Sequence, residues 1–351
     1  MKRIFLALSL ILSLTMVSAQ PKTPADAQKA ITKAQAAAED AKKATKPDTW
    51  IKLAKAYIDA YEQPTRNILT GTPQQEVKIF LKDQRVLGTE QRKGAEGAYS
   101  VDIYADKELW YNENGILEFY LVTKPAAEGD LLGEAITALE KAKELDPKNA
   151  KAKDLTELMN GIHEKLANEA LSEYLSGNFG EAAELFKKTA ASQASPILGS
   201  TDPVNTYYTA LVSNLAGNKE QAIEFYKKCI DMEYFQDGNT FSNLADIYRQ
   251  EGNAEACRET LQAGFVQFPE NNGILIGLIN YYMENNEDTG KLFDLLHKAQ
   301  SIDPKNASLY SAEGNVYKKL GDMDNAASLY KKAEEINPDY VFAPLSLGVL
   351  Y

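Results

Sequence analysis

The chain has 351 residues, of which 25% are charged and 44% hydrophobic, and its formal net charge is −12. This composition is typical of a globular protein, and the length allows either one large core or an extended array. The acidic balance argues against a general nucleic-acid binder, because such a protein needs a basic face.

Residues 1–19 have the pattern of a secretory signal peptide. Lys2 and Arg3 precede an apolar run over residues 4–16, and small residues up to Ala19 follow it. The run is too short for a membrane span, and its flanks suit a cleavage site. We therefore expect an exported protein, periplasmic or secreted, that has no membrane span after cleavage; an uncleaved anchor is the alternative.

Residues 20–62 are expected to be helical. The Ala-rich segment 23–45 opens with Thr23-Pro24, a helix start signal, and predicts an N-terminal capping helix. A second helix follows, with large and small apolar residues on one face. These residues are Trp50, Leu53, Ala54 and Tyr57.

Residues 63–128 have a different character. Within them TPQQEVKIFLKD predicts a short helix, with Thr72 as its cap and Pro73 at its first position. This interpretation places three apolar residues on one face of that helix: Val77, Phe80 and Leu81.

Strand signals follow in the same segment. Residues 98–105 alternate apolar and polar side chains, and residues 107–124 hold two strand-like runs around Asn112-Glu113-Asn114-Gly115, a hairpin turn. We therefore predict that residues 63–128 are a small α+β insertion with a β-hairpin.

Helices are expected again from residue 129 onward. The segment between Pro147 and Gly177 is long, which predicts either one elongated helix or two helices broken near Gly161. Residues 192–203 follow as a loop excursion.

Four columns of residues then recur at spacings of 35, 35 and 34. They are Gly217, Gly252, Glu287 and Gly321; Ala222, Cys257, Leu292 and Ala326; Tyr226, Leu261, Leu296 and Tyr330; and Cys229, Gly264, Ala299 and Ala333. The first column suits a turn between two helices, and the other three place small, bulky and small side chains on one helical face. Prolines close three of the units, at Pro269, Pro304 and Pro338.

This pattern resembles the tetratricopeptide repeat (TPR) family, whose unit is a 34-residue helix–turn–helix. The best single match is residues 307–340, although Glu313 stands where the family has Leu, and Glu287 replaces a turn Gly elsewhere. Its matching residues are Tyr310, Gly314, Tyr317, Ala326, Tyr330, Ala333 and Pro338. The resemblance implies an all-α solenoid of TPR repeats over residues 129–351, with the α+β insertion.

The resemblance also makes the helix around residues 50–57 the first helix of a repeat. Its second helix is expected at residues 134–149, so that the insertion at 63–128 splits the repeat. At the other end, residues 341–351 fit only the first helix of a further repeat. We expect either a fragment of a longer array or an end that another subunit covers.

The sequence offers little for catalysis. Its two histidines, His163 and His297, lie in different repeats and have no ligand spacing with a cysteine or another histidine. Cys229 and Cys257 are expected to be buried thiols rather than a disulfide, because the repeat places them too far apart. We therefore predict no catalytic residue, no cofactor, no metal and no enzyme activity.

The family resemblance implies that a protein or peptide partner binds the concave face, which the first helix of each repeat lines. The candidate residues are Tyr174, Tyr207, Leu211, Asn214, Asp246, Arg249, Tyr281, Asn315, Lys318 and Lys319. Some family members hold a carboxylate with Lys and Asn; Tyr207 and Leu211 stand there instead, so that clamp is not supported. Two alternatives stay open: a self-assembling envelope or secretion component that pairs through its apolar C-terminal helix, and a hydrolase or carbohydrate-binding protein with its site in residues 63–128.

Overall fold

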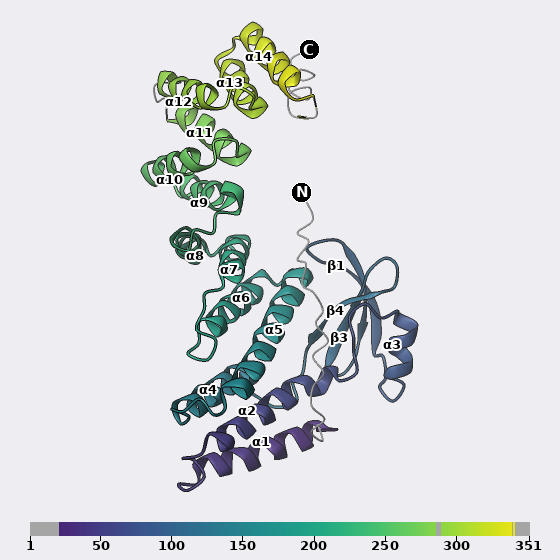
Figure 1. Cartoon of the computed structure of the whole chain (residues 1–351). Coiled ribbons are helices and arrows are strands. Elements are labelled where there is room, and N and C mark those ends of the chain that lie inside the picture. The colour runs from purple at the N-terminus through teal and green to yellow at the C-terminus, as the bar shows by residue number, and fades with distance from the viewer. Residues whose placement is uncertain (1–20, 286–288, 339, 341–351) are drawn as a thin grey trace. The chain divides into compact units, whose positions relative to one another are not determined.

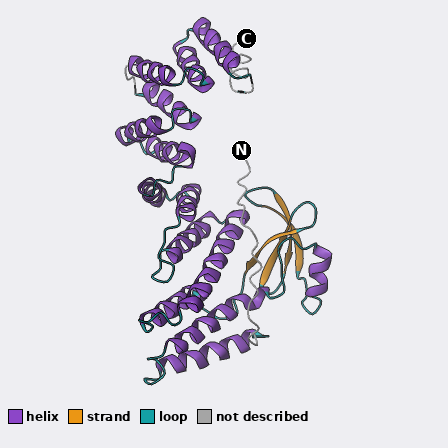
Figure 2. Cartoon of the chain, in the orientation of Figure 1, coloured by secondary structure: helices purple, strands orange, loops and turns teal. Residues whose placement is uncertain are grey.

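The structure is a computed structural model, and it describes residues 21–285, 289–338 and 340. The predicted signal peptide, Glu287 and the C-terminal segment 341–351 lie outside the described residues. The described part is mostly helical and contains one four-stranded antiparallel sheet (Figure 1, Figure 2). The prediction of a helical protein with a small α+β insertion is confirmed.

The chain divides into two compact units, residues 1–212 and 213–351. The first unit contains α1 (Pro24–Glu39), α2 (Pro47–Glu62), the 3-10 helix η1 (Gln63–Thr65), α3 (Gln74–Phe80), β1 (Gly88–Lys93), β2 (Ala98–Ile103), β3 (Lys107–Tyr111), β4 (Leu117–Val122), α4 (Leu131–Glu144), α5 (Ala152–Ser176) and α6 (Phe179–Gln193). Helix α7 (Pro203–Leu215) spans the boundary. The second unit continues with α8 (Lys219–Asp231), η2 (Gln236–Gly238), α9 (Asn239–Gln250), α10 (Ala254–Gln267), α11 (Asn272–Glu284), α12 (Thr289–Ile302), α13 (Ala307–Leu320) and α14 (Met323–Ile336).

Helix α1 begins where the sequence predicts. The Thr23 hydroxyl accepts from the Asp26 backbone N–H at 3.2 Å, and the Asp26 carboxylate accepts from the Thr23 N–H at 3.2 Å. This reciprocal capping fixes the start of the helix, with Pro24 at its first position. The helix ends at Glu39, shorter than the expected segment 23–45.

Helices α2 and α4 pack against one another although residues 63–130 separate them in the chain. Leu53, Ala54 and Tyr57 of α2 share one buried core with Ala135 and Leu139 of α4. Two helices that are remote in sequence therefore form one helical pair, and the insertion is the chain segment that connects them.

Helix α5 is continuous over 25 residues and contains Gly161 in its interior. Of the two alternatives, the elongated helix is the one that forms. It ends at Gly177, whose φ of 95° is left-handed. The Gly177 N–H donates to the Tyr174 carbonyl, and the Asn178 N–H donates to the Glu173 carbonyl. The expected loop separates α6 from α7.

The insertion is a meander with strand order β1-β2-β3-β4. Strands β3 and β4 form the predicted hairpin, closed by hydrogen bonds between Asn112 and Ile116, and β2 is the predicted alternating strand. Strand β1, which the sequence analysis did not predict, pairs with β2 from Gly88–Ile103 to Lys93–Ala98.

Each face of the sheet is covered. On one face Leu109, Tyr111 and Leu117 pack with Val77 of α3 and with Leu81, the residue that follows this helix. On the other face Tyr99, Val101, Trp110 and Phe119 form a cluster that packs against Leu175 of α5.

Two details of the predicted helix at 72–83 are wrong. Pro73 is the N-cap residue rather than the first helical residue, and no side chain caps the helix. Phe80 is 59% exposed and does not share the buried face of Val77 and Leu81. At 3.6 residues per turn it lies about 100° around the helix axis from Leu81, at the edge of that face.

The second unit shows why Gly followed by Asn or Asp recurs. Gly217, Gly252 and Gly321 have φ between 74° and 84° and end the first helix of each pair. The next residue, Asn or Asp, caps the second helix; Asn253, for example, accepts from the Ala256 N–H at 3.2 Å. One short motif thus stops one helix and starts the next.

The small and bulky columns form the seam between the paired helices. Their described members are buried, among them Ala222, Leu261, Leu296 and Tyr330. Cys229 and Cys257 belong to this seam as free, buried thiols, as predicted, and burial raises the pKa of Cys229 to about 12.

Candidate functional site

The first helices α9, α11 and α13 of the second unit are neighbours, since α11 packs against both others. A column of polar residues stands at the C-terminal end of α7 and of each of these helices, at a constant spacing of 35 residues. Its members are Asn214, Arg249, Glu284 and Lys319. We call this column the polar ladder; three of its members are predicted site residues, and Glu284 is one that the sequence analysis missed.

Arg249 of α9 forms an ion pair with the next member of the polar ladder, Glu284 of α11. Its guanidinium lies 2.7 Å from the Asp246 carboxylate on its own helix and 3.8 Å from the Glu284 carboxylate on α11. The hydrogen bond to Asp246 is the main cause that raises the pKa of Arg249. All three side chains are about half exposed, so these ion pairs are screened and easily exchanged.

Lys319 connects α13 to α11 by a hydrogen bond. Its ammonium donates to the Asn280 side-chain oxygen on α11 at 2.7 Å. Asn315 is turned toward its own repeat instead, where its side chain accepts from the Tyr330 hydroxyl at 2.7 Å. Lys318 is half-buried beside them.

Tyr281 was predicted to line the binding face, but its ring is buried. Only 4% of it is exposed, and its ring packs edge-on against Tyr282 with centroids 5.5 Å apart. It belongs to the packing of α11, because its position on the helix faces the neighbouring helices.

The candidates of the first unit are also engaged within the protein. The Tyr174 hydroxyl donates to Glu96 of the insertion at 3.0 Å, and burial together with this bond raises the pKa of Tyr174 to about 12. Tyr207 is half-buried with its ring edge-on to Tyr208, and Leu211 is half-buried.

The insertion is attached to the end of α5 at the same place. The Ala95 N–H donates to the Leu175 carbonyl at 2.9 Å, next to the bond between Glu96 and Tyr174. Gly94 makes this approach feasible, because a Cβ there would lie 2.2 Å from the Leu175 carbonyl oxygen. No local sequence pattern indicates a contact between segments so far apart in the chain.

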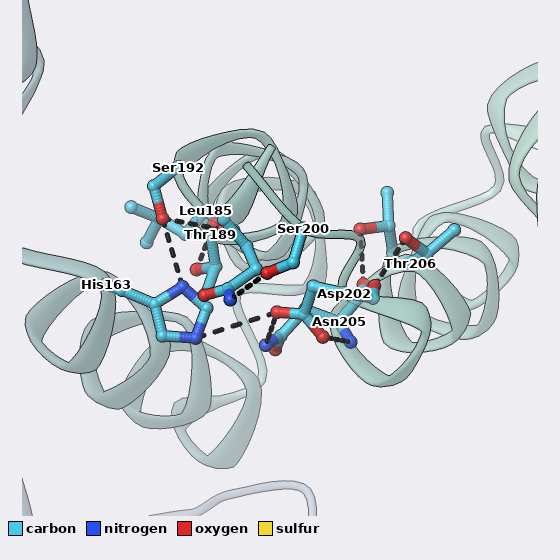
Figure 3. A network of polar contacts seen from close by, with 10 residues as sticks. His163, Leu185, Thr189, Ser192, Ser200, Asp202, Asn205 and Thr206 are labelled. Atoms are coloured by element: carbon cyan, nitrogen blue, oxygen red, sulfur yellow. Dashed lines mark hydrogen bonds and ion pairs between the residues drawn. The ribbon is translucent and has the colours of Figure 1, made fainter. Parts of the chain in front are cut away.

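A serine, a histidine and an aspartate meet near the loop between α6 and α7 (Figure 3). His163 Nδ1 lies 3.0 Å from Ser192 Oγ, and its Nε2 lies 3.6 Å from Asp202. Ser192 is 2% exposed and donates its proton to the Thr189 carbonyl at 2.7 Å, so its hydroxyl is not placed to attack a substrate. Asp202 accepts from the Asn205 backbone N–H at 2.9 Å at the start of α7. The network joins α5, α6 and the start of α7, and its geometry is that of a structural cross-link.

A polar hollow of 340 Å³ lies at the opposite ends of the first helices in the second unit. Asn272, Asn306, Ser308 and Tyr340 line it, and the Tyr340 hydroxyl bonds Asn272 at 3.2 Å. None of the predicted site residues lines this hollow.

The described residues hold neither a metal-binding cluster nor a membrane-spanning helix. Among them, no three His, Cys, Asp or Glu side chains gather in a way that could hold a metal ion. Within the same ranges no helix combines the length and the apolar character that crossing a membrane requires.

Two segments, residues 214–234 and 307–340, match the tetratricopeptide repeat family model. The chain carries TPR sequence in these segments. The first runs from the end of α7 through α8, and the second covers the α13–α14 pair. Asn214 thus lies in the first TPR segment, and Asn315, Lys318 and Lys319 lie in the second.

Solved structures resemble the chain at low identity, and two of the following three are named as TPR proteins. A thermophilic TPR protein from Thermus thermophilus is 18% identical, with a TM-score of 0.35, over 54% of this chain and 98% of that one. A tetratricopeptide repeat protein from Parabacteroides merdae is 14% identical, with a TM-score of 0.34, over 63% and 90%. Yeast Tom70 is 13% identical, with a TM-score of 0.42, over 93% and 70%. No curated protein matches the sequence. The similarity to TPR proteins is therefore shown by sequence in the two matched segments.

Proposed function

We propose that this protein is an exported scaffold that binds a protein or peptide partner on the face of α9, α11 and α13. The observation that carries the proposal is the polar ladder, which repeats once per helical pair and presents exposed charges. Stacked helical pairs offer such a face to an extended ligand. Export is supported by the composition of residues 1–19.

The ladder suggests how a partner is held. Arg249 and Lys319 bear positive charge on either side of Glu284, so a partner would place acidic groups opposite the two basic residues. Arg249 is already oriented by Asp246 and can exchange one carboxylate for another, because exposed ion pairs contribute only about 0–1 kcal/mol. Binding would be reversible and sensitive to salt.

Affinity capture from envelope extracts tests this proposal. The chain without residues 1–19 serves as bait, beside the double variant Arg249→Ala/Lys319→Ala and a control, Lys298→Ala/Lys331→Ala. The control removes the same charge from the second helices α12 and α14, where both lysines are exposed. We expect the ladder variant to lose specific partners that the control retains. An identical capture profile for all three baits would reject the proposed face.

No observation in the described residues favours a self-assembling component or a site for hydrolysis or carbohydrate binding in the insertion. The proposal therefore stands without a second candidate.

A further inference from the structure

The most exposed large apolar side chains described in the first unit lie within one stretch, residues 69–87. They are Leu69 at 60%, Ile79 at 68%, Phe80 at 59% and Leu87 at 61% exposed. The next in that unit, Val204 and Val122, are only 41% and 37% exposed. Single exposed apolar residues are ordinary, whereas several within one short stretch indicate a contact surface.

Helix α3 shows how two of these side chains are presented. Val77 and the following Leu81 fix one side of the helix to the sheet. Ile79 lies on the opposite side of the helix and Phe80 on the flank between the two sides, and both are exposed. Figure 1 shows α3 beside the sheet, and Leu175 at the end of α5 packs against the sheet's other face. The exposed side chains of α3 thus stand on a helix whose other side is anchored to the sheet.

The segment 69–87 carries a net charge of +1, opposite in sign to that of the whole chain. Residues 69–87 contain three basic residues, Lys78, Lys82 and Arg85, and two acidic ones, while the protein carries −12. All three basic side chains are exposed. The Lys78 ammonium lies 3.7 Å from the carboxylate of the buried Asp102, so lipid contacts are assigned to Lys82 and Arg85.

We propose that α3 and the turn that follows it form a peripheral membrane contact, which binds bilayers containing anionic lipid. Ile79, Phe80 and Leu87 would enter the boundary between headgroups and acyl chains, and Lys82 and Arg85 would meet lipid phosphates. The acidic remainder of the chain is repelled by such a surface, so the contact orients the insertion toward the membrane. This inference does not depend on the proposed partner-binding face.

A protein partner fits this surface less well than a lipid. A stable protein interface takes about 20–30 residues from each side, whereas this surface consists of a few side chains on a seven-residue helix and in the short segment after it. A protein partner would need a surface complementary to these side chains, whereas a bilayer accepts exposed apolar side chains without one.

Vesicle flotation tests the proposal with the chain that lacks residues 1–19, because the apolar leader would itself bind lipid. All helices and strands described lie within residues 21–340. The probes are vesicles of phosphatidylcholine alone and of equal parts phosphatidylcholine and phosphatidylglycerol. We expect binding to the anionic vesicles, and about tenfold weaker binding after Ile79→Ser/Phe80→Ser. Lys82→Gln/Arg85→Gln should weaken binding by about tenfold on anionic vesicles only.

The matched control is Val266→Ser/Ile302→Ser, which removes two side chains that are 82% and 78% exposed in the second unit and should bind as the unmodified chain does. Quenching of a Phe80→Trp variant by brominated lipid provides a second readout that is independent of any loss of folding. Absence of flotation with anionic vesicles, or equal flotation of Ile79→Ser/Phe80→Ser, would overturn the proposal. Self-association that is lost in Ile79→Ser/Phe80→Ser, without vesicle binding, would overturn it in favour of a second copy.

Discussion

Gly94 shows how one residue fixes the attachment of the insertion. A Cβ at this position would lie 2.2 Å from the Leu175 carbonyl oxygen and 2.8 Å from the Tyr99 ring. Neither the backbone carbonyl of α5 nor the buried ring can move freely, so the turn between β1 and β2 would have to withdraw. The adjacent bond from the Ala95 N–H to Leu175 would lengthen with it.

We expect Gly94→Ala to lower the free energy of unfolding of the first unit by about 1–3 kcal/mol. Gly97→Ala in the same turn is the control and should have little effect, because nothing lies within 4 Å of the added Cβ. Denaturant unfolding followed by tryptophan fluorescence measures both, since Trp50 and Trp110 lie in the first unit. Equal stability of the two variants would show that the turn does not depend on this close contact.

At the scale of elements, the patterns that repeat were the predictable ones. The alternation of residues 98–105 and the turn at residues 112–115 predicted β2 and the β3–β4 hairpin correctly. Strand β1 was missed because its sequence, GTEQRK, is polar and lies mostly exposed at the edge of the sheet. It forms through pairing with β2, a tertiary effect that no local pattern carries.

Glycine has opposite effects on stability in the middle of α5 and at its C-terminal end. Gly161 lies inside a continuous helix with nothing within 4 Å of an added Cβ, whereas Gly177 has a φ of 95° at the C-terminal end. The first glycine weakens the helix through its backbone entropy, and the second supplies a conformation that other residues adopt only with strain.

Gly161→Ala should therefore raise the free energy of unfolding by about 0.5–1 kcal/mol. Gly177→Ala, the same chemical change sixteen residues later, should lower it by about 1–2 kcal/mol. Thermal unfolding by circular dichroism, with fluorescence for the first unit, provides the comparison. A destabilising Gly161→Ala would mean that α5 is interrupted there in solution.

For the molecule as a whole, the spacing of 35 residues was enough to predict helical pairs, their turns and the buried seam. It was not enough to predict which face residues are accessible. Tyr281 is turned into the packing, and Tyr174 is bound by Glu96, a residue 78 positions away in the chain. Accessibility of a repeat face depends on what else folds onto it, and an insertion adds contacts that repeat spacing does not encode.

The pairing of α2 with α4 leads to a prediction about the insertion. Because these helices share a core directly, replacing residues 66–128 by a short Gly/Ser linker should preserve the helical pair. The shortened chain should remain helical by circular dichroism, and Trp50 should still report one cooperative transition. We expect lower stability than in the full chain, because Leu175 loses its apolar neighbours and Tyr174 loses Glu96.

A version of the shortened chain that also carries Leu175→Gln separates two causes of instability: the exposure of Leu175 and the loss of the bond between Tyr174 and Glu96. If exposure of that leucine is the main cost, this version should be more soluble and no less stable than the shortened chain alone. Loss of the Trp50 transition in both versions would show that α2 and α4 need the insertion to pair. Partner capture by the polar ladder should be unchanged in a folded shortened chain, since the ladder residues all lie in the second unit; a lost capture profile would instead place the insertion in the binding mechanism.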